Sequence, residues 1–125
     1  MVENDFIKSV EQSVEQLLYN KFDVTDEIFL FIPLYHNYSE IKYNLIVSSK
    51  KIDNISIRKI INEIFNSLDQ QKQKKINKID IMSSNENLMN NLKFIAFGNN
   101  DLYEINNIRV GDVYLEKAYL YKTKR

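Results

Sequence analysis

The chain of 125 residues has no cysteine and no tryptophan, and it has one histidine, one proline and two glycines. The lack of cysteine excludes a disulfide framework and every thiolate metal site. A single histidine, His36, excludes multi-histidine metal sites, and its place in a predicted turn favours a solvated side chain over a proton-transfer group. Gly98 and Gly111 are too few for a glycine-rich phosphate loop. We therefore expect no metal, no cofactor and no catalytic residue.

Long apolar runs are also missing. The longest, residues 28–34, is interrupted by Pro33 and falls far short of the roughly 20 residues that a membrane-spanning helix needs. The N-terminal residues 1–5 are acidic and no apolar run follows them, so we expect no secretory signal. These features predict a cytoplasmic protein without a membrane partner.

Neither sign of charge is in excess, because 17 basic residues balance 17 acidic ones. This balance disfavours a general nucleic-acid binder. Residues 1–49 nevertheless carry a formal charge of −5 and residues 50–125 a charge of +5, which either steers a charged partner or lets opposite charges meet across one folded surface. The basic cluster Lys72, Lys74, Lys75 and Lys78 is either a phosphate contact or a solvated helix end. Lysine outnumbers arginine, and isoleucine and asparagine are abundant, as in an AT-rich bacterial or phage gene.

Apolar spacing of three and four residues predicts two amphipathic helices. The first begins after Asp5 as N-cap and includes Phe6, Ile7, Val10, Val14, Leu17 and Leu18. The second is capped by Ser56, carries an apolar stripe from Ile57 to Leu68, and ends in the basic residues 70–75. Ser83 and Glu86 predict a capping box for a third, short helix through Leu88, Met89 and Leu92.

The strand signals lie between these helices. Residues 27–32 are β-branched and aromatic, and Pro33 is expected to end this strand before a turn at residues 35–39. Alternation from Ile41 to Val47 predicts a second strand and a hairpin, and residues 79–82 a third strand. One or two more strands are expected within residues 102–122, around Gly111-Asp112.

This order predicts one α+β domain over residues 1–125. The elements follow as α-β-β-α-β-α-β-β, and we expect a mixed or antiparallel sheet with the helices packed mainly on one face.

Part of this pattern resembles the minimal nucleotidyltransferase domain of bacterial antitoxin-type pairs. The match is best at residues 78–82, followed by Asn85, Leu92, Phe94, Gly98 and the Leu-Tyr-Glu of residues 102–104. The resemblance places Asp80 at the position of the third catalytic carboxylate. It implies a nucleotide-binding cleft near Asp80.

The residues that carry that family's chemistry are replaced. Ile32-Pro33 stands where the family has Gly-Ser, and Lys42 and Asn44 stand at the positions of its metal-binding Asp-x-Asp. A lysine at a metal ligand's position repels the magnesium that the reaction needs. The resemblance thus implies a catalytically degenerate domain that binds a nucleotide or a partner domain.

A second expectation comes from the absence of catalytic equipment. Small bacterial toxin-immunity proteins are similar in kind, because they inhibit a toxin or enzyme by covering its active site and need no motif of their own. We expect a non-catalytic protein-binding module of this immunity or antitoxin type. The residues expected to bind the partner are Glu11, Glu15, Asp26, Glu27, Tyr35, Tyr38 and Glu40. Asp23 belongs to the same acidic half, and Tyr114 is the other tyrosine whose position suggests exposure.

Overall fold

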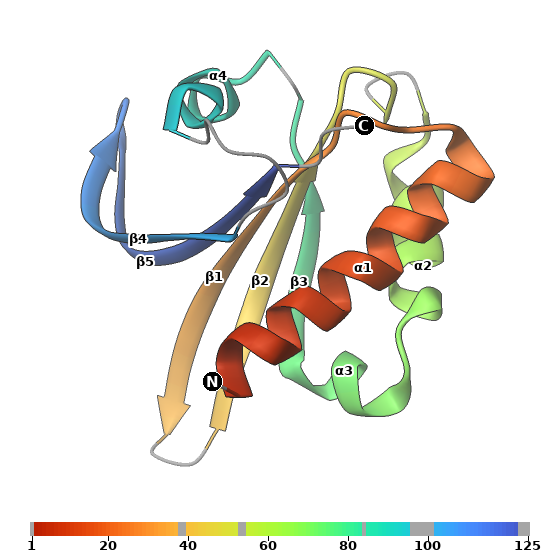
Figure 1. Cartoon of the computed structure of the whole chain (residues 1–125), viewed down its shortest axis with the longest axis horizontal. Helices are drawn as coiled ribbons and strands as arrows, with labels where there is room; N and C mark the ends of the chain where they lie inside the picture. The colour runs from red at the N-terminus through yellow and green to blue at the C-terminus, as the bar shows by residue number, and fades with distance from the viewer. Residues whose placement is uncertain (1, 38–39, 53–54, 84, 96–101, 123–125) are drawn as a thin grey trace.

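The computed structural model describes residues 2–37, 40–52, 55–83, 85–95 and 102–122 (Figure 1). Its elements in chain order are α1 (Val2–Phe22), β1 (Ile28–Asn37), β2 (Glu40–Ser48), α2 (Ile57–Ser67), α3 (Gln70–Lys75), β3 (Ile76–Ile81), α4 (Asn87–Ile95), β4 (Leu102–Val110) and β5 (Val113–Lys122). The predicted α+β class and the predicted order are confirmed. The short α3 occupies what was predicted as the basic end of the second helix.

The five strands form one mixed sheet in the order β3-β2-β1-β5-β4. Only the β2–β3 pair is parallel, and the other three pairs are antiparallel. A parallel pair needs a crossover connection, which α2 and α3 provide. The mixed alternative among the predicted sheets is therefore the correct one.

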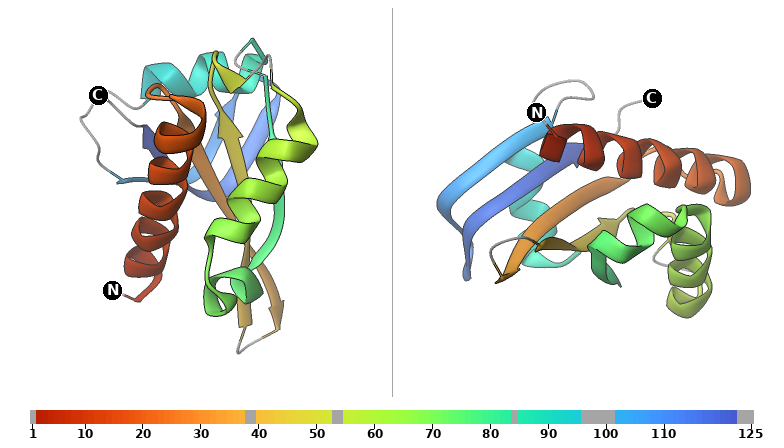
Figure 2. Two further views of the ribbon diagram at one scale, coloured as in Figure 1. Left: turned by 90° about the vertical axis from the view of Figure 1, so that its right-hand side faces the viewer. Right: turned by 90° about the horizontal axis from the view of Figure 1, so that it is seen from below.

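Helices α1 and α2 cover one face of the sheet, side by side (Figure 2, left). Helix α1 buries Ile7, Val10, Val14 and Leu18 completely, and their spacing puts them on one stripe of the helix. Lys21 of α1 forms an ion pair of 2.6 Å with Glu63 of α2 on the outer surface. Strand residues that point into this core include Phe29, Phe31, Leu45, Val47, Ile79, Tyr119 and Tyr121.

Helix α4 packs on the opposite face and defines a second core. Its residues Met89 and Leu92 are fully buried. They belong to a cluster with Ile28, Leu30, Ile46, Ile105, Val110, Leu115, Ala118 and Leu120 of the strands. The sheet is thus buried on both faces near its middle.

The third strand begins earlier than predicted, at Ile76, and the first helix and first strand also differ from their predicted boundaries. Helix α1 begins at Val2, so Asp5 lies within the helix and is not its N-cap. Strand β1 continues through Pro33 to Asn37 instead of ending at the proline. Pro33 pairs with Tyr43 of β2, whereas the described pairing of β1 with β5 stops at Phe31. A residue without an N–H group fits a strand position where one side has no ladder.

Two helix signals were also misplaced. The predicted second helix is interrupted at Leu68, which is extended (φ −92°, ψ 141°), and Asp69 then caps α3. Leu68 remains buried despite the interruption. Ser83 Oγ accepts from the Asn85 N–H at 3.2 Å, and the Glu86 N–H donates to the Ser83 carbonyl. The predicted capping box is therefore wrong, and α4 begins later, at Asn87. The predicted Ser56 cap is confirmed, since its side chain accepts from the Lys59 N–H.

The Asp69 cap predicts a specific pH dependence. The hydrogen bond from the Lys72 backbone N–H holds the pKa of the Asp69 carboxyl below its ordinary value. A carboxyl whose pKa is lowered on folding stabilises the folded chain above the unfolded pKa, and this stabilisation is lost as the pH falls through the folded pKa. The unfolding free energies of the wild type and Asp69→Asn, measured by urea denaturation, should therefore converge on acidification. A gap that widens at acid pH would contradict this.

Gly111 turns the chain between β4 and β5 and predicts a sensitive position. Its φ is +60°, and a Cβ there would lie 2.9 Å from Asn91 Nδ2 of α4. Gly111→Ala should lower the unfolding free energy by about 1–2 kcal/mol, as expected for a left-handed non-glycine residue. In Gly111→Ala/Asn91→Ala the contact is relieved and only the backbone cost remains, so thermal or urea unfolding separates the two effects. A Gly111→Ala protein as stable as the wild type would refute this role.

Candidate functional site

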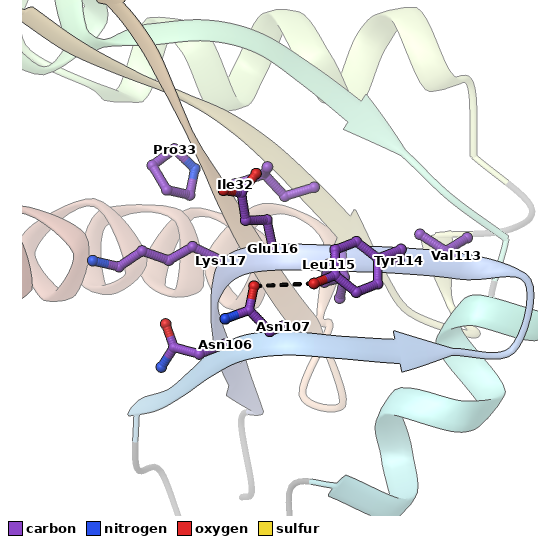
Figure 3. A pocket seen from close by; sticks show the side chains of 9 residues that line it. All are labelled: Ile32, Pro33, Asn106, Asn107, Val113, Tyr114, Leu115, Glu116 and Lys117. Carbon is purple, nitrogen blue, oxygen red and sulfur yellow. Dashed lines mark hydrogen bonds between the residues drawn. The ribbon is translucent and has the colours of Figure 1, made fainter.

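A hollow among the described residues lies where β1 and β5 separate. The two strands pair from Ile28 with Lys122 to Phe31 with Tyr119. Among the described residues, β1 after Phe31 is paired with β2 alone. Likewise, the described part of β5 before Tyr119 is paired with β4 alone. The hollow between the separating strands, of about 570 Å³, is here called the fork. Its lining residues are Ile32, Pro33, Asn106, Asn107, Val113, Tyr114, Leu115, Glu116 and Lys117 (Figure 3).

The two walls of the fork come from different parts of the chain. Ile32 and Pro33 of β1 form one wall, and the β4–β5 hairpin supplies the other, as Figure 3 shows. The hairpin curls away from the plane of the other strands (Figure 1). Its tip lies against α4, since a Cβ at Gly111 would be 2.9 Å from Asn91 Nδ2 of that helix. The fork is therefore a consequence of this curl.

Asn107 is the point at which the hairpin changes direction. Its φ is +51°, a left-handed conformation that asparagine adopts more readily than most residues. On the open side of Asn107, Ile105 of β4 and its partner Ala118 of β5 belong to the core beneath α4. On the side of the hairpin tip, Val110 of β4 and Leu115 of β5 belong to the same core. Ile105 and Val110 differ by an odd number of positions, so a regular strand would place them on opposite faces. The Asn107 conformation thus lets both ends of the hairpin contribute to one core.

Tyr114 stands over this irregular position. Its hydroxyl donates a hydrogen bond of 3.0 Å to Asn107 Oδ1 (Figure 3). The side chain is nevertheless 56% exposed, and Ile108 and Val113, which the β4–β5 register places on the other face of the hairpin, are 41% and 38% exposed. The exposure expected for Tyr114 is confirmed. We call Ile108, Val113 and Tyr114 the hairpin patch.

The charges at the fork are mixed. Lys117 lies 3.7 Å from Glu104 across the β4–β5 pair and 5.7 Å from the centre of the Tyr119 ring. Glu116, the neighbouring acid, is exposed. One acid and one base line the hollow, so the fork has no strong preference for a ligand of either charge.

The predicted acidic residues do not come together. Glu11 and Glu27 are buried, so they are not available on the surface. Asp26 is exposed and accepts a hydrogen bond of 2.6 Å from Ser49 Oγ, and Glu15 is half-buried on α1. Glu40 pairs with Asn37 at one end of the β1–β2 hairpin, whereas Asp26 precedes its other end at the Ile28–Ser48 pair. Those ends are roughly 30 Å apart, so no single acidic patch forms.

The aromatic residues predicted near them are only partly described. Tyr35 lies in β1, opposite Ile41 of β2, and His36 lies in the same strand rather than in the predicted turn. Tyr38 is outside the described residues. Asp23, the other acid named from the sequence, has φ +55° and an ion pair of 2.9 Å with Lys51.

Asp80 lies on β3 beside β2. Its register partner is Ile46, and Asn44 pairs with Lys78, so Asp80 and Asn44 share one face of the sheet. The Asp80 carboxylate forms an ion pair of 3.2 Å with Lys78. In this arrangement a lysine stands beside the carboxylate that the resemblance singles out.

The basic cluster is also partly neutralised. Lys72 lies 3.6 Å from Asp69, and the Lys75 ammonium lies 5.3 Å from the centre of the Phe6 ring. A smaller hollow of about 330 Å³ lies here between α1 and α3, and both Asp5 and Asp69 line it. These acids reduce the attraction that the lysines would exert on a phosphate.

Other kinds of site find no support in the described part of the chain. It holds no group of three or more histidine, aspartate or glutamate side chains that could coordinate a metal ion. None of its helices combines the length and the hydropathy that a bilayer crossing demands.

The sequence pointed to Tyr114 but missed the rest of the fork. Asn106 and Asn107 interrupt the apolar pattern of β4 and stand four residues before Gly111-Asp112. This pair of turn-forming residues inside a strand was the available signal for an irregular hairpin. The separation of β1 from β5 is a tertiary feature with no local signature. Comparisons of the chain with protein-family models, with curated proteins and with solved structures give no match.

The Asn107 conformation gives a testable prediction. Asn107→Gly should retain the fold, because glycine adopts a positive φ without steric cost. Asn107→Val should lower the unfolding free energy by about 1–2 kcal/mol, because a β-branched side chain opposes that φ. Both variants lose the acceptor of the Tyr114 hydroxyl, so urea denaturation of the pair isolates the backbone effect. Equal stability of the two variants would rule it out.

Proposed function

We propose that the chain is a non-catalytic protein-binding module that contacts its partner through the hairpin patch. The observation that carries this proposal is the grouping of Ile108, Val113 and Tyr114, all exposed, on one hairpin beside the fork. Tyrosine and large apolar side chains next to a hollow supply the anchors that protein interfaces use. Lysine and glutamate, which interface cores disfavour, are absent from the hairpin patch and line the neighbouring fork as Lys117 and Glu116.

The partner in this proposal is a toxin or enzyme that the module inhibits by covering its active site. The curled hairpin forms one side of the molecule (Figure 1), and its exposed surface supports covering of a partner's active site. Inhibition of this kind needs shape and burial, and it needs no reactive group on the inhibitor. Asp26 and Glu15 remain as acidic residues able to contribute to encounter with a basic partner.

The first test is capture of the partner on the immobilised full-length chain from the native host, followed by titration of the captured protein. We expect a single stoichiometric partner whose enzymatic activity falls on binding. Tyr114→Ala should weaken the affinity roughly tenfold or more, the effect of removing an aromatic interface anchor.

A matched control distinguishes an anchor from general surface apolarity. Ile57, the first residue of α2, is 54% exposed, and α2 packs on the face of the sheet opposite α4 (Figure 2). Ile57→Ala should leave the affinity unchanged. Equal affinity of the Tyr114→Ala and wild-type proteins would overturn the hairpin patch as the contact surface, and captured proteins that keep their activity would overturn inhibition.

A second candidate function is nucleotide binding by a degenerate nucleotidyltransferase-like domain. The observation in its favour is that Asp80 and Asn44 lie on adjacent parallel strands and on one face. A magnesium nucleotide that binds there should raise the melting temperature, because a ligand of the folded state stabilises it. The shift should vanish in Asp80→Ala. A shift of the same size in Asp80→Ala would exclude this site.

A further inference from the structure

The fork leaves two strand edges facing a common hollow. In the part of the chain that the structure describes, residues 32–37 of β1 have β2 on one side and no paired strand on the other. Residues 113–118 of β5 have β4 on one side and likewise no paired strand towards β1. Backbone N–H and C=O groups on an unpaired strand edge are a template for another strand. The fork is therefore suited to a ligand whose backbone is extended.

We propose that the fork binds an extended segment of the partner protein, which adds to the free edge of β1 as a further strand. This inference rests on the proposed function and specifies how the partner is held. Residues 32–35 are in regular register with β2 before the irregularity between Tyr35 and Asn37. They offer four regular positions, or roughly 13 Å of strand, which is within the range of strand lengths found in sheets. The volume of about 570 Å³ lies within the range of binding clefts, roughly 300–1,000 Å³.

The side chains of the two walls define what the segment carries. Ile32 and Leu115 pack with the core beneath α4 and offer an apolar surface on that side. Asn106 and Lys117 face each other in the β4–β5 register and lie on the opposite side. Successive side chains of a strand alternate between such sides. The segment therefore has apolar residues at every second position and uncharged hydrogen-bonding residues between them, since Lys117 is already opposed by Glu104.

Pro33 limits how the segment pairs. A proline has no N–H group to donate. The backbone hydrogen bonds between β1 and the segment at this position therefore use N–H groups of the segment and of the β1 residues beyond Pro33. Pro33 also disfavours pairing of the β1 edges of two copies of the chain, because proline on an edge strand hinders edge-to-edge association. Its presence favours a foreign segment over a second copy.

The test uses random octapeptides displayed on phage as the probe and the immobilised full-length chain as the target. We expect enriched peptides with apolar residues spaced by two. Methylation of backbone nitrogens, one at a time, in the best synthetic peptide should weaken binding at least tenfold at alternate positions and little at the others. If the chain recognised only the side chains of the peptide, the loss of binding on methylation would not alternate from one backbone nitrogen to the next. No enrichment, or a methylation profile without this period, would overturn the proposal.

Two exposed asparagines provide the matched variants. Asn106→Trp fills the fork at an exposed position of β4, and Asn62→Trp adds the same side chain to the exposed surface of α2. Asn106→Trp should abolish peptide binding and partner binding, and Asn62→Trp should abolish neither. If Tyr114→Ala releases the partner while Asn106→Trp retains it, the protein-binding function stands and strand addition is wrong. Dimerisation of the free chain that Asn106→Trp prevents would also overturn it, because a second copy would then be the occupant.

Discussion

Burial of the first half of β1 on both faces is the constraint on which the rest of the structure depends. Phe29 and Phe31 point into the core beneath α1 and α2, and Ile28 and Leu30 point into the core beneath α4. A strand that is apolar on both sides has to be covered on both sides. It also needs strands on both edges, and β2 and β5 supply them over residues 28–31.

The fork begins after Phe31, the last residue of β1 that is paired with β5 in the described part of the chain. Past Phe31 the chain reaches Pro33, and β5 leaves β1 to follow the hairpin towards α4. The left-handed conformation of Asn107 lets Val110 and Leu115 join the core of Ile105 and Ala118. Apolar burial under α4 is thus gained by bending the hairpin, and the bend both opens the hollow and exposes Tyr114. The same physical cause produces both parts of the proposed binding surface.

Much of the fold was predictable because the signals are local. Apolar periodicity located α1, α2 and the hairpin strands, and Ser56 marked the start of α2. The predicted boundaries were wrong where a residue type is compatible with two local structures. Pro33 ends strands in general, yet it is accommodated at an unpaired edge, and Leu68 continues an apolar stripe, yet it is buried in an extended conformation. For the site, the sequence suggested the exposure of Tyr114 but gave no reason to group it with Ile32 or Asn106.

The sequence by itself determined the composition of the core, the α+β class and the lack of thiolate chemistry, because these follow from residue types and their period along the chain. The tertiary structure decided which polar residues face solvent. Glu11 and Glu27 look like surface acids in the sequence and are buried, whereas Ile108 and Val113 look like core residues and are exposed. Exposure depends on which elements cover a residue from elsewhere in the chain, and no local pattern records where β5 departs from β1.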